Sequence, residues 1–221
     1  MKMKRKLAVG LMLCLGMMTG CGGSQTPQEE VDHPAMELVD IGGMTLKTAE
    51  NEDMKYQYDA EVWEQDEAVF NSLVTYQKGT LETEFPISLN AQVAGKYKEG
   101  LTEKFMEESL AMLEQNATIT VETCEMRSFN GEPIIYMENF TAFSDAVIDE
   151  MIENEQWTEE MIEEAGGREE ILCIPDSRSI IVYAVAGEKL VVYGGTYYTE
   201  DQKQMVADGV NVMLQTTEMK E

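Results

Sequence analysis

The sequence predicts an α+β fold in which an antiparallel sheet of about six or seven strands carries helices packed on its faces. Several short runs alternate apolar and polar residues, a pattern that is typical of strands with one buried side. The segments 100–116 and 199–214 instead repeat their apolar residues with the period of an amphipathic helix. Short turns join neighbouring strand runs, and such turns favour antiparallel pairing.

The first 20 residues have the features of a signal peptide. Basic residues crowd the first six positions, and an uncharged apolar segment, Leu7–Met18, follows them. This segment is shorter than the roughly 20 apolar residues that a membrane-spanning helix needs. The next letters, "MTGC", resemble the lipobox of bacterial lipoproteins, and the resemblance implies that the thiol of Cys21 receives a diacylglycerol. The alternative is an ordinary secretory signal, residues 1–20, that happens to precede a cysteine.

Lipidation of Cys21 predicts where the mature chain resides. Each buried methylene contributes about 0.8 kcal/mol to membrane binding, so two acyl chains such as palmitate on one residue form a stable anchor. We therefore expect a lipid-anchored protein on the outer face of the cytoplasmic membrane. Residues 21–42 are polar and show no helical or alternating pattern, which predicts a flexible tether. A single α+β domain, residues 43–221, is expected to follow.

The first half of the domain reads as strands followed by a helix. Residues 54–63 predict a strand that runs into a turn at Trp63. Residues 69–79 and 81–89 predict a hairpin-like pair. The segment 100–116 is the first amphipathic helix, and its apolar stripe consists of Leu101, Phe105, Met106, Leu110 and Leu113.

The middle of the domain reads as a hairpin followed by two acidic helices. Asn130 and Gly131 lie between the strand-like runs 117–126 and 132–143, and an Asn-Gly pair in such a place is a strong hairpin signal. Two short helices are then expected, at 144–156 with Ser144 as the N-cap and at 158–167 with Thr158 as the first residue.

The last part of the domain reads as a meander and a closing helix. Strands are expected at 171–175, 179–187 and 189–198, joined by short turns. The helix 199–214 begins with a capping box, Thr199 to Gln202, and is expected to lie across the sheet. Its stripe is expected to bury Met205, Val206, Val210 and Met213, and Gly209 lies within that stripe, where a missing side chain permits close approach to the sheet.

This order of elements resembles the PsbP-type α/β/α sandwich of photosystem extrinsic subunits and of many small bacterial lipoproteins. The resemblance rests on the runs "YQYDAEVW", "IIVYAVAGEKLVVYGGTYY" and "TEDQKQMVADGVNVML", and it covers about residues 43–217. It implies a binding or assembly scaffold, mostly non-enzymatic in that family. It carries over no functional residue, because a fold does not fix a function.

The chain is strongly acidic, with 42 Asp and Glu against 16 Lys and Arg and a formal net charge of −26. Binding to nucleic acid needs clustered basic residues, so nucleic acid is not an expected partner. The negative charge favours a basic protein, another cell-envelope partner or divalent cations as partners. Alternatively, the charge only keeps a surface protein soluble. The acidic helices between Asp145 and Glu170 lack a calcium-binding loop, so we expect only weak, salt-screened cation association there.

The domain lacks the residue sets of common catalytic sites. Its two cysteines, Cys124 and Cys173, are not spaced as metal ligands, and free thiols are favoured over a disulfide. The sole histidine, His33, lies in the predicted tether, which leaves no base for Ser-His or Cys-His hydrolysis. We therefore expect no catalytic residue, metal ligand or cofactor. The favoured function is a ligand-binding or protein-interaction module, and the alternative is a carboxylate-based hydrolase of cell-wall glycans.

A group of tyrosines near the end of the meander is the candidate ligand-binding surface. Aromatic side chains can stack on sugars or hold peptides, and these tyrosines belong to neighbouring strand-like runs. Packing in the core is the alternative use, because tyrosine is common in strands. The candidate residues are Tyr183, Tyr193, Tyr197 and Tyr198.

Overall fold

The computed structural model describes residues 33–65 and 72–220, which form two antiparallel sheets and five helices. The predicted signal peptide, Cys21 and the first part of the predicted tether lie outside the described residues. The strands are β1 Leu46–Glu50, β2 Met54–Asp59, β3 Trp63–Gln65, β4 Leu73–Gln77, β5 Ser88–Lys96, β6 Ile119–Phe129, β7 Glu132–Thr141, β8 Ser177–Ala186, β9 Lys189–Tyr197 and β10 Glu218–Met219. The helices are α2 Glu103–Leu113, α3 Asp145–Glu153, α4 Glu159–Glu164, α5 Arg168–Leu172 and α6 Glu200–Thr216.

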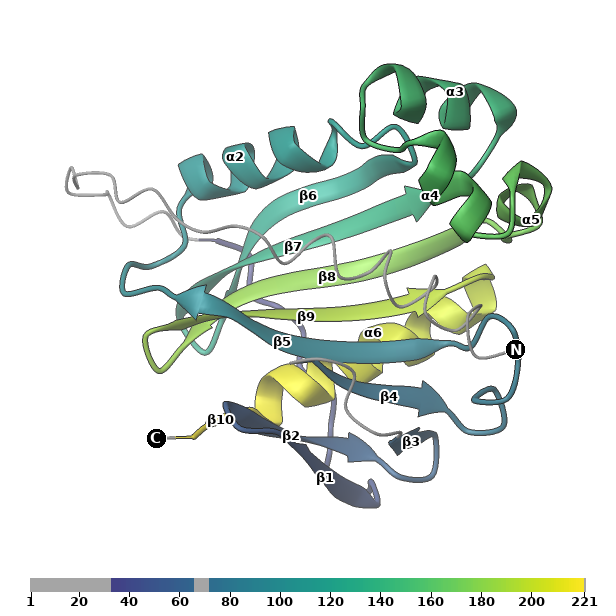
Figure 1. The fold of residues 1–221 in the computed structure, drawn as a ribbon. Helices are drawn as coiled ribbons and strands as arrows, with labels where there is room; N and C mark the ends of the chain where they lie inside the picture. The colour runs from purple at the N-terminus through teal and green to yellow at the C-terminus, as the bar shows by residue number, and fades with distance from the viewer. Residues whose placement is uncertain (1–32, 66–71, 221) are drawn as a thin grey trace.

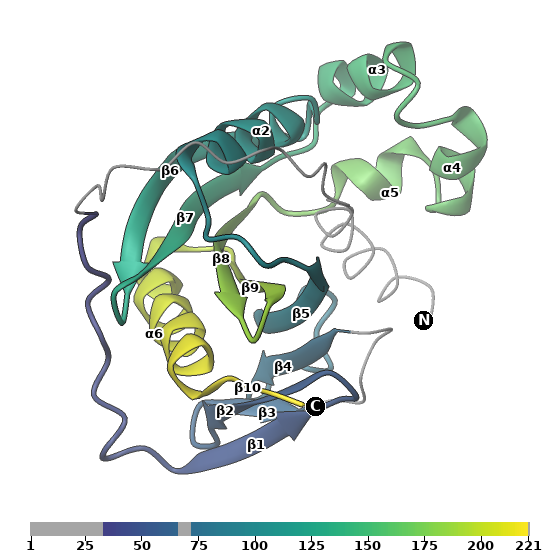
Figure 2. The same ribbon diagram turned by 90° about the vertical axis from the view of Figure 1, so that its left-hand side faces the viewer.

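A seven-stranded sheet with the order β3-β4-β5-β9-β8-β7-β6 forms the centre of the molecule (Figure 1). Every neighbouring pair in it is antiparallel. Helices α2 and α6 lie on opposite faces of this sheet, as the turned view in Figure 2 shows. The predicted fold class, α+β with helices on both faces of an antiparallel sheet, is confirmed. A smaller sheet, β1-β2-β10, packs beside α6 and was not predicted.

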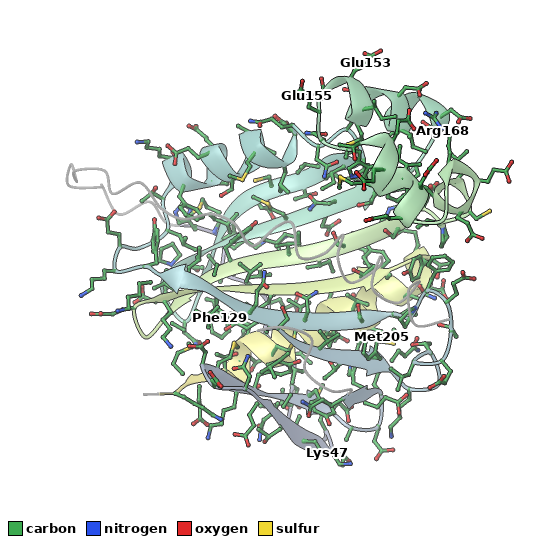
Figure 3. All side chains as sticks on the ribbon, in the orientation of Figure 1. Lys47, Phe129, Glu153, Glu155, Arg168 and Met205 are labelled. Carbon is green, nitrogen blue, oxygen red and sulfur yellow. The ribbon has the colours of Figure 1, made fainter. Side chains whose placement is uncertain are left out.

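Helix α6 packs closely on the central sheet because two glycines leave room for it. A Cβ on Gly209 of α6 would lie 2.5 Å from a methyl group of Leu89 in β5, and a Cβ on Gly195 of β9 would lie 2.4 Å from Val206 in α6. The predicted apolar stripe of this helix is confirmed for Val206, Val210 and Met213, which are fully buried. Met205, labelled in Figure 3, is only partly buried.

The hairpin of β6 and β7 has the predicted Asn-Gly turn. Asn130 and Gly131 both have positive φ, 53° and 86°, which the tight turn requires and which these two residue types tolerate. Phe129 pairs with Glu132 directly beside the turn, at the hairpin end labelled in Figure 3. The local sequence alone therefore determined this connection.

Three predicted strand features were wrong. The run 171–175 is not a strand: Ile171 belongs to α5 and is buried against Ile148 and Ile162 of the neighbouring helices, so tertiary packing outweighs its local strand preference. Trp63 begins the short strand β3 instead of lying in a turn. Most of the run 81–89 forms turns, and the strand β5 begins only at Ser88 and continues to Lys96.

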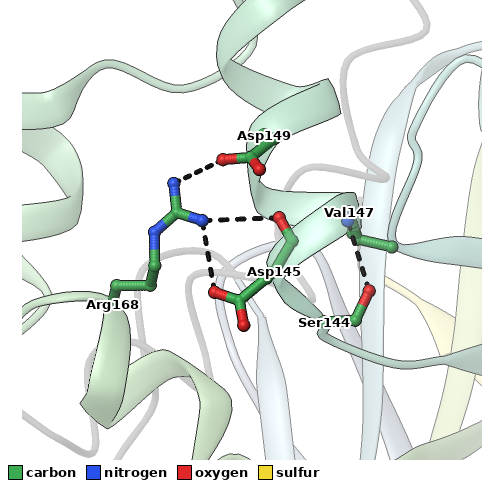
Figure 4. A network of polar contacts seen from close by, with 5 residues as sticks. All are labelled: Ser144, Asp145, Val147, Asp149 and Arg168. Carbon is green, nitrogen blue, oxygen red and sulfur yellow. Dashed lines mark hydrogen bonds and ion pairs between the residues drawn. The ribbon is translucent and has the colours of Figure 1, made fainter.

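Helices α3, α4 and α5 form a helical insert, residues 142–176, between β7 and β8. The predicted N-cap of α3 is confirmed, since the Ser144 hydroxyl accepts a hydrogen bond from the Val147 amide (3.2 Å). Thr158, predicted to open the next helix, is the N-cap of α4 and accepts from the Met161 amide (3.2 Å). Arg168 joins the first and last of these helices by bonding to Asp145 and Asp149, as Figure 4 shows. The insert thus has its own small core and its own ion-pair network.

Candidate functional site

Residues 34–42, here called the strap, lie along the domain instead of forming part of a free tether. The amide of Met36 donates to the carbonyl of Ser128 (2.8 Å), and Ser128 donates back to Pro34 (3.0 Å), so the strap begins at the end of β6. From there it runs past α6 to β1, as the purple segment in Figure 2 shows. The sequence predicted a tether up to residue 42 because this segment shows no helical or alternating pattern, although the strap itself contains several apolar residues. Its order comes from hydrogen-bonding partners that are distant in the sequence.

Asn211 of α6 holds the main chain of the strap through both ends of its amide. Its Oδ1 accepts from the Val39 amide (3.2 Å), and its Nδ2 donates to the Glu37 carbonyl (2.7 Å). Gln215, one turn further along α6, donates to the Val39 carbonyl (3.0 Å). Asn211 is only 3% exposed, so its amide needs hydrogen-bonding partners, and its Oδ1 also accepts from Gln215 (2.7 Å). These hydrogen bonds go to backbone atoms of the strap, not to its side chains.

A pocket of about 340 Å³ lies between the strap, the sheet and α6, and is here called the strap pocket. Residues 36–39 of the strap form one side of it. Because one side is the strap itself, the pocket is complete only while the strap is docked. The other lining residues are Arg127, Tyr136 and Ile180 on the sheet and Gln204, Ala207, Asp208 and Asn211 on α6.

Arg127 is the cationic side chain that lines the strap pocket, and its orientation is fixed from two directions. Its guanidinium carbon lies 3.7 Å from the centre of the Tyr136 ring, a cation–π contact with the neighbouring strand. Its Nε donates to Glu125 (2.7 Å), and its Nη2 reaches the same carboxylate oxygen. The side chain remains 28% exposed. Arg127 is therefore preorganised and still accessible to a ligand.

A buried polar chain continues from Tyr136 along the same face of the sheet. The Tyr136 hydroxyl donates to Glu138 (2.7 Å), and Lys203 of α6 bonds the other oxygen of that carboxylate (2.6 Å). Burial alone would raise the pKa of Glu138, but the bonds from Lys203 and Tyr136 outweigh it and hold this pKa below its ordinary value. A general acid needs the opposite shift, so Glu138 is not suited to the acid role in a glycan hydrolase.

The predicted tyrosine surface does not exist as an accessible platform. Tyr193 and Tyr197 are buried in the core on the α6 face of the sheet, whereas Tyr183 is buried on the α2 face, where it contacts Phe105. Burial raises the pKa of each of these three tyrosines to about 12. Tyr198 is the partly exposed member and packs edge-on against Phe85. Successive residues of a strand point to opposite faces of the sheet, which separates Tyr183 on β8 from Tyr193 and Tyr197 on β9. These three tyrosines pack in the core, which is the alternative use given for them above.

The other predicted chemical features lie apart from the strap pocket. Cys124 and Cys173 are free thiols, on β6 and at the end of α5, respectively. The acids of the helical insert lie at one end of the molecule, where Figure 3 labels Glu153, Glu155 and Arg168. Within residues 33–65 and 72–220, no group of three or more His, Cys, Asp or Glu residues is arranged to hold a metal ion. Weak cation association by the insert stays a prediction.

Sequence reasoning missed the residues that build this site. Arg127 lies in an otherwise ordinary strand, and its role depends on the ring of Tyr136 in the partner strand. Asn211 gave one usable signal, a polar residue inside the apolar run "VNVML" of the closing helix. An amide at such a position is buried, and a buried amide needs partners. The sequence offers no indication that those partners lie in the strap.

Comparisons with known proteins find similar structures but no related sequence. No family model matches the chain, and no curated protein matches it. Among solved structures, PsbP of Synechocystis sp. PCC 6803 matches with a TM-score of 0.42 and 10% identity over 84% of this chain and 98% of that chain. The Ran-binding protein Mog1p of Saccharomyces cerevisiae matches at 0.43 and 8%, over 80% and 96%. LpqN of Mycobacterium tuberculosis, involved in cell envelope biogenesis, matches at 0.44 and 9%, over 82% and 87%.

The first of these structures belongs to the family that the order of elements resembles. Similarities this distant do not bear on what the chain binds. In the part of the chain that the structure describes, no helix is both long enough and apolar enough to cross a bilayer.

Proposed function

We propose that this chain is a lipid-anchored extracytoplasmic binding protein whose ligand enters the strap pocket. The observation that carries the proposal is the pocket itself, where three separate segments bring an oriented arginine, amide groups and aliphatic side chains together. Its volume of about 340 Å³ falls at the lower end of the range for small-molecule sites, roughly 300–1,000 Å³. A small ligand is therefore the expected occupant.

The membrane anchor in this proposal is supported by the sequence alone. The short apolar segment that ends at "MTGC" is the pattern of a lipoprotein signal, and Cys21 is the residue that would carry the lipid. The strap begins only a dozen or so residues after Cys21. The binding pocket would therefore lie outside the cytoplasmic membrane and close to its surface.

Replacing Cys21 with serine should remove the lipid and leave the folded domain intact. The thiol is the proposed acceptor of the diacylglycerol, and a serine hydroxyl does not substitute for it. Cells expressing Cys21→Ser with a fatty-acid probe should yield unlabelled protein, and its melting temperature should equal that of the original chain. Cys14→Ser is the matched control, because the signal peptide that contains Cys14 is predicted to be removed; this variant should remain labelled. Continued labelling of Cys21→Ser would contradict the anchor.

Replacing Asn211 with leucine should loosen the strap on α6, where the bond from Gln215 to the Val39 carbonyl remains. The leucine has a similar shape but neither donates to the Glu37 carbonyl nor accepts from the Val39 amide, and each lost bond is worth about 0.5–1.5 kcal/mol. Hydrogen exchange at the Val39 amide should accelerate about tenfold, while amides in β8 and β9 keep their protection. Gln204→Ala is the control, because Gln204 lines the pocket and its side chain donates to Asp208, not to the strap.

The same variant tests the function. Small fragments that bind the full chain should shift the NMR signals of residues around the strap pocket. Asn211→Leu should weaken this binding, because it loosens the side of the pocket that the strap forms. Saturable binding that is located elsewhere, or that is unchanged in Asn211→Leu, would overturn the strap pocket as the binding site.

A further inference from the structure

We infer that the strap pocket takes a zwitterionic ligand, namely a short peptide with both ends free and an aliphatic side chain. The inference rests on the proposed function, since it names the chemical class of ligand for the same pocket. Its basis is the arrangement of charge and apolar surface among the lining residues.

The carboxylate of such a ligand matches the free part of Arg127. Glu125 occupies the edge of the guanidinium that contains Nε and Nη2, and the Tyr136 ring covers one of its faces. Among residues 33–65 and 72–220, no group forms a hydrogen bond with Nη1 of Arg127. A ligand carboxylate can therefore accept a charge-assisted bond from Nη1 without displacing Glu125. The contacts that Arg127 already makes hold it in place, so little side-chain entropy is lost when the ligand binds.

The ammonium group of the ligand matches the two carboxylates that line the pocket, Glu37 on the strap and Asp208 on α6. Gln204 donates to Oδ1 of Asp208 (2.8 Å), which leaves Oδ2 as an acceptor. A purely anionic ligand would meet both carboxylates, and a purely cationic ligand would meet Arg127. A ligand that carries both charges places its carboxylate at Nη1 of Arg127, beside the Glu125 that already pairs with this arginine, and its ammonium at the carboxylates of Glu37 and Asp208.

Five of the other lining residues have apolar, non-aromatic side chains. Met36, Val39, Ile180 and Ala207 border the pocket together with Leu38, which is 50% exposed. An aliphatic side chain of the ligand would cover this apolar surface, and burial of that surface contributes to binding in proportion to its area. The small volume restricts the ligand to a short peptide.

The test is an NMR titration of the full chain with alanyl-leucine and with its two blocked forms, N-acetyl-alanyl-leucine and alanyl-leucine amide. The unblocked dipeptide should shift the signals of pocket residues saturably at concentrations up to about 10 mM. Each blocked form lacks one charge and should bind about tenfold more weakly or worse, because each loses a charge-assisted hydrogen bond.

Two charge-removing variants assign the ends of the ligand. Arg127→Gln should weaken the unblocked dipeptide about tenfold and should have little further effect on the amide, which already lacks the carboxylate. Asp208→Asn should weaken the unblocked dipeptide and should have little further effect on the N-acetyl form. The melting temperature of each variant checks that the fold is intact. Equal effects of a variant on all three peptides would overturn the assigned orientation.

The outcomes separate this inference from the proposed function. If spermidine or acetate saturates the pocket and the dipeptide does not, the zwitterionic ligand is overturned while the binding function stands. If neither these probes nor any fragment perturbs the pocket, both are overturned.

Discussion

The domain should fail to fold when Val210 is replaced by aspartate. Val210 is fully buried between α6 and the central sheet, in contact with the core that contains Leu89 and Tyr193. A carboxylate at this position would have no partner and no access to water. Substitutions of this kind cost more than about 4 kcal/mol, which is a large part of the roughly 5–15 kcal/mol that stabilises a typical domain.

Circular dichroism and thermal melting of the purified chain measure this effect. Val210→Asp should show no cooperative transition, whereas Val210→Thr, which keeps the shape and adds only a neutral hydroxyl, should still fold with a loss of about 1–3 kcal/mol. A cooperative melting curve for Val210→Asp near that of the original chain would show that α6 does not pack on the sheet as described.

Adding a single methyl group at Gly195 should destabilise the domain by about 1–3 kcal/mol. The new Cβ would lie 2.4 Å from Cγ1 of Val206 and 3.0 Å from Leu89, and Val206 has few rotamers with which to relieve the clash. Gly195 does not have positive φ, so the loss measures packing and not backbone strain. Chemical denaturation of Gly195→Ala gives the value.

A second substitution identifies the clash as the cause. In the double variant Gly195→Ala with Val206→Ala, the shortened side chain leaves room for the new methyl group, so the loss of stability should be smaller than the sum of the two single losses by about 0.5–3 kcal/mol. Gly100→Ala is the control, since its nearest neighbour would lie 3.9 Å away, and it should change stability by less than about 0.5 kcal/mol. Additive losses would show that β9 and α6 are less tightly packed at this point.

Features that depend on local sequence were predictable, and those that depend on distant contacts were not. The Asn130-Gly131 turn needs only two residues that tolerate positive φ, and the capping box of α6 needs only Thr199 and Gln202, whose side chain accepts from the Thr199 amide (3.1 Å). The fold class followed from such local signals. Helix α5 was mistaken for a strand because its apolar residues suit either structure until the neighbouring helices bury Ile171.

The candidate site was harder to predict than the fold because the contacts that dock the strap are remote in sequence. Asn211 and Val39 are separated by 172 residues, and the bond between them gives order to a segment with no pattern of its own. The tyrosines were misjudged for a related reason: their identity suggested binding, but the side of the sheet on which each lies decides its exposure. Only the paired strands reveal that Tyr183 and Tyr193 point to opposite faces.

The position of the strap gives the proposed anchor a mechanical consequence. If the lipid is held in the membrane and a bound partner pulls on the domain, tension enters the fold through residues 34–42 before it reaches β1. The first bonds to carry this load are those to Ser128, Asn211 and Gln215, not those of the central sheet. They would break before the core unfolds, and the pocket would lose one side. Under load, therefore, the protein would release a small ligand while its domain remained folded.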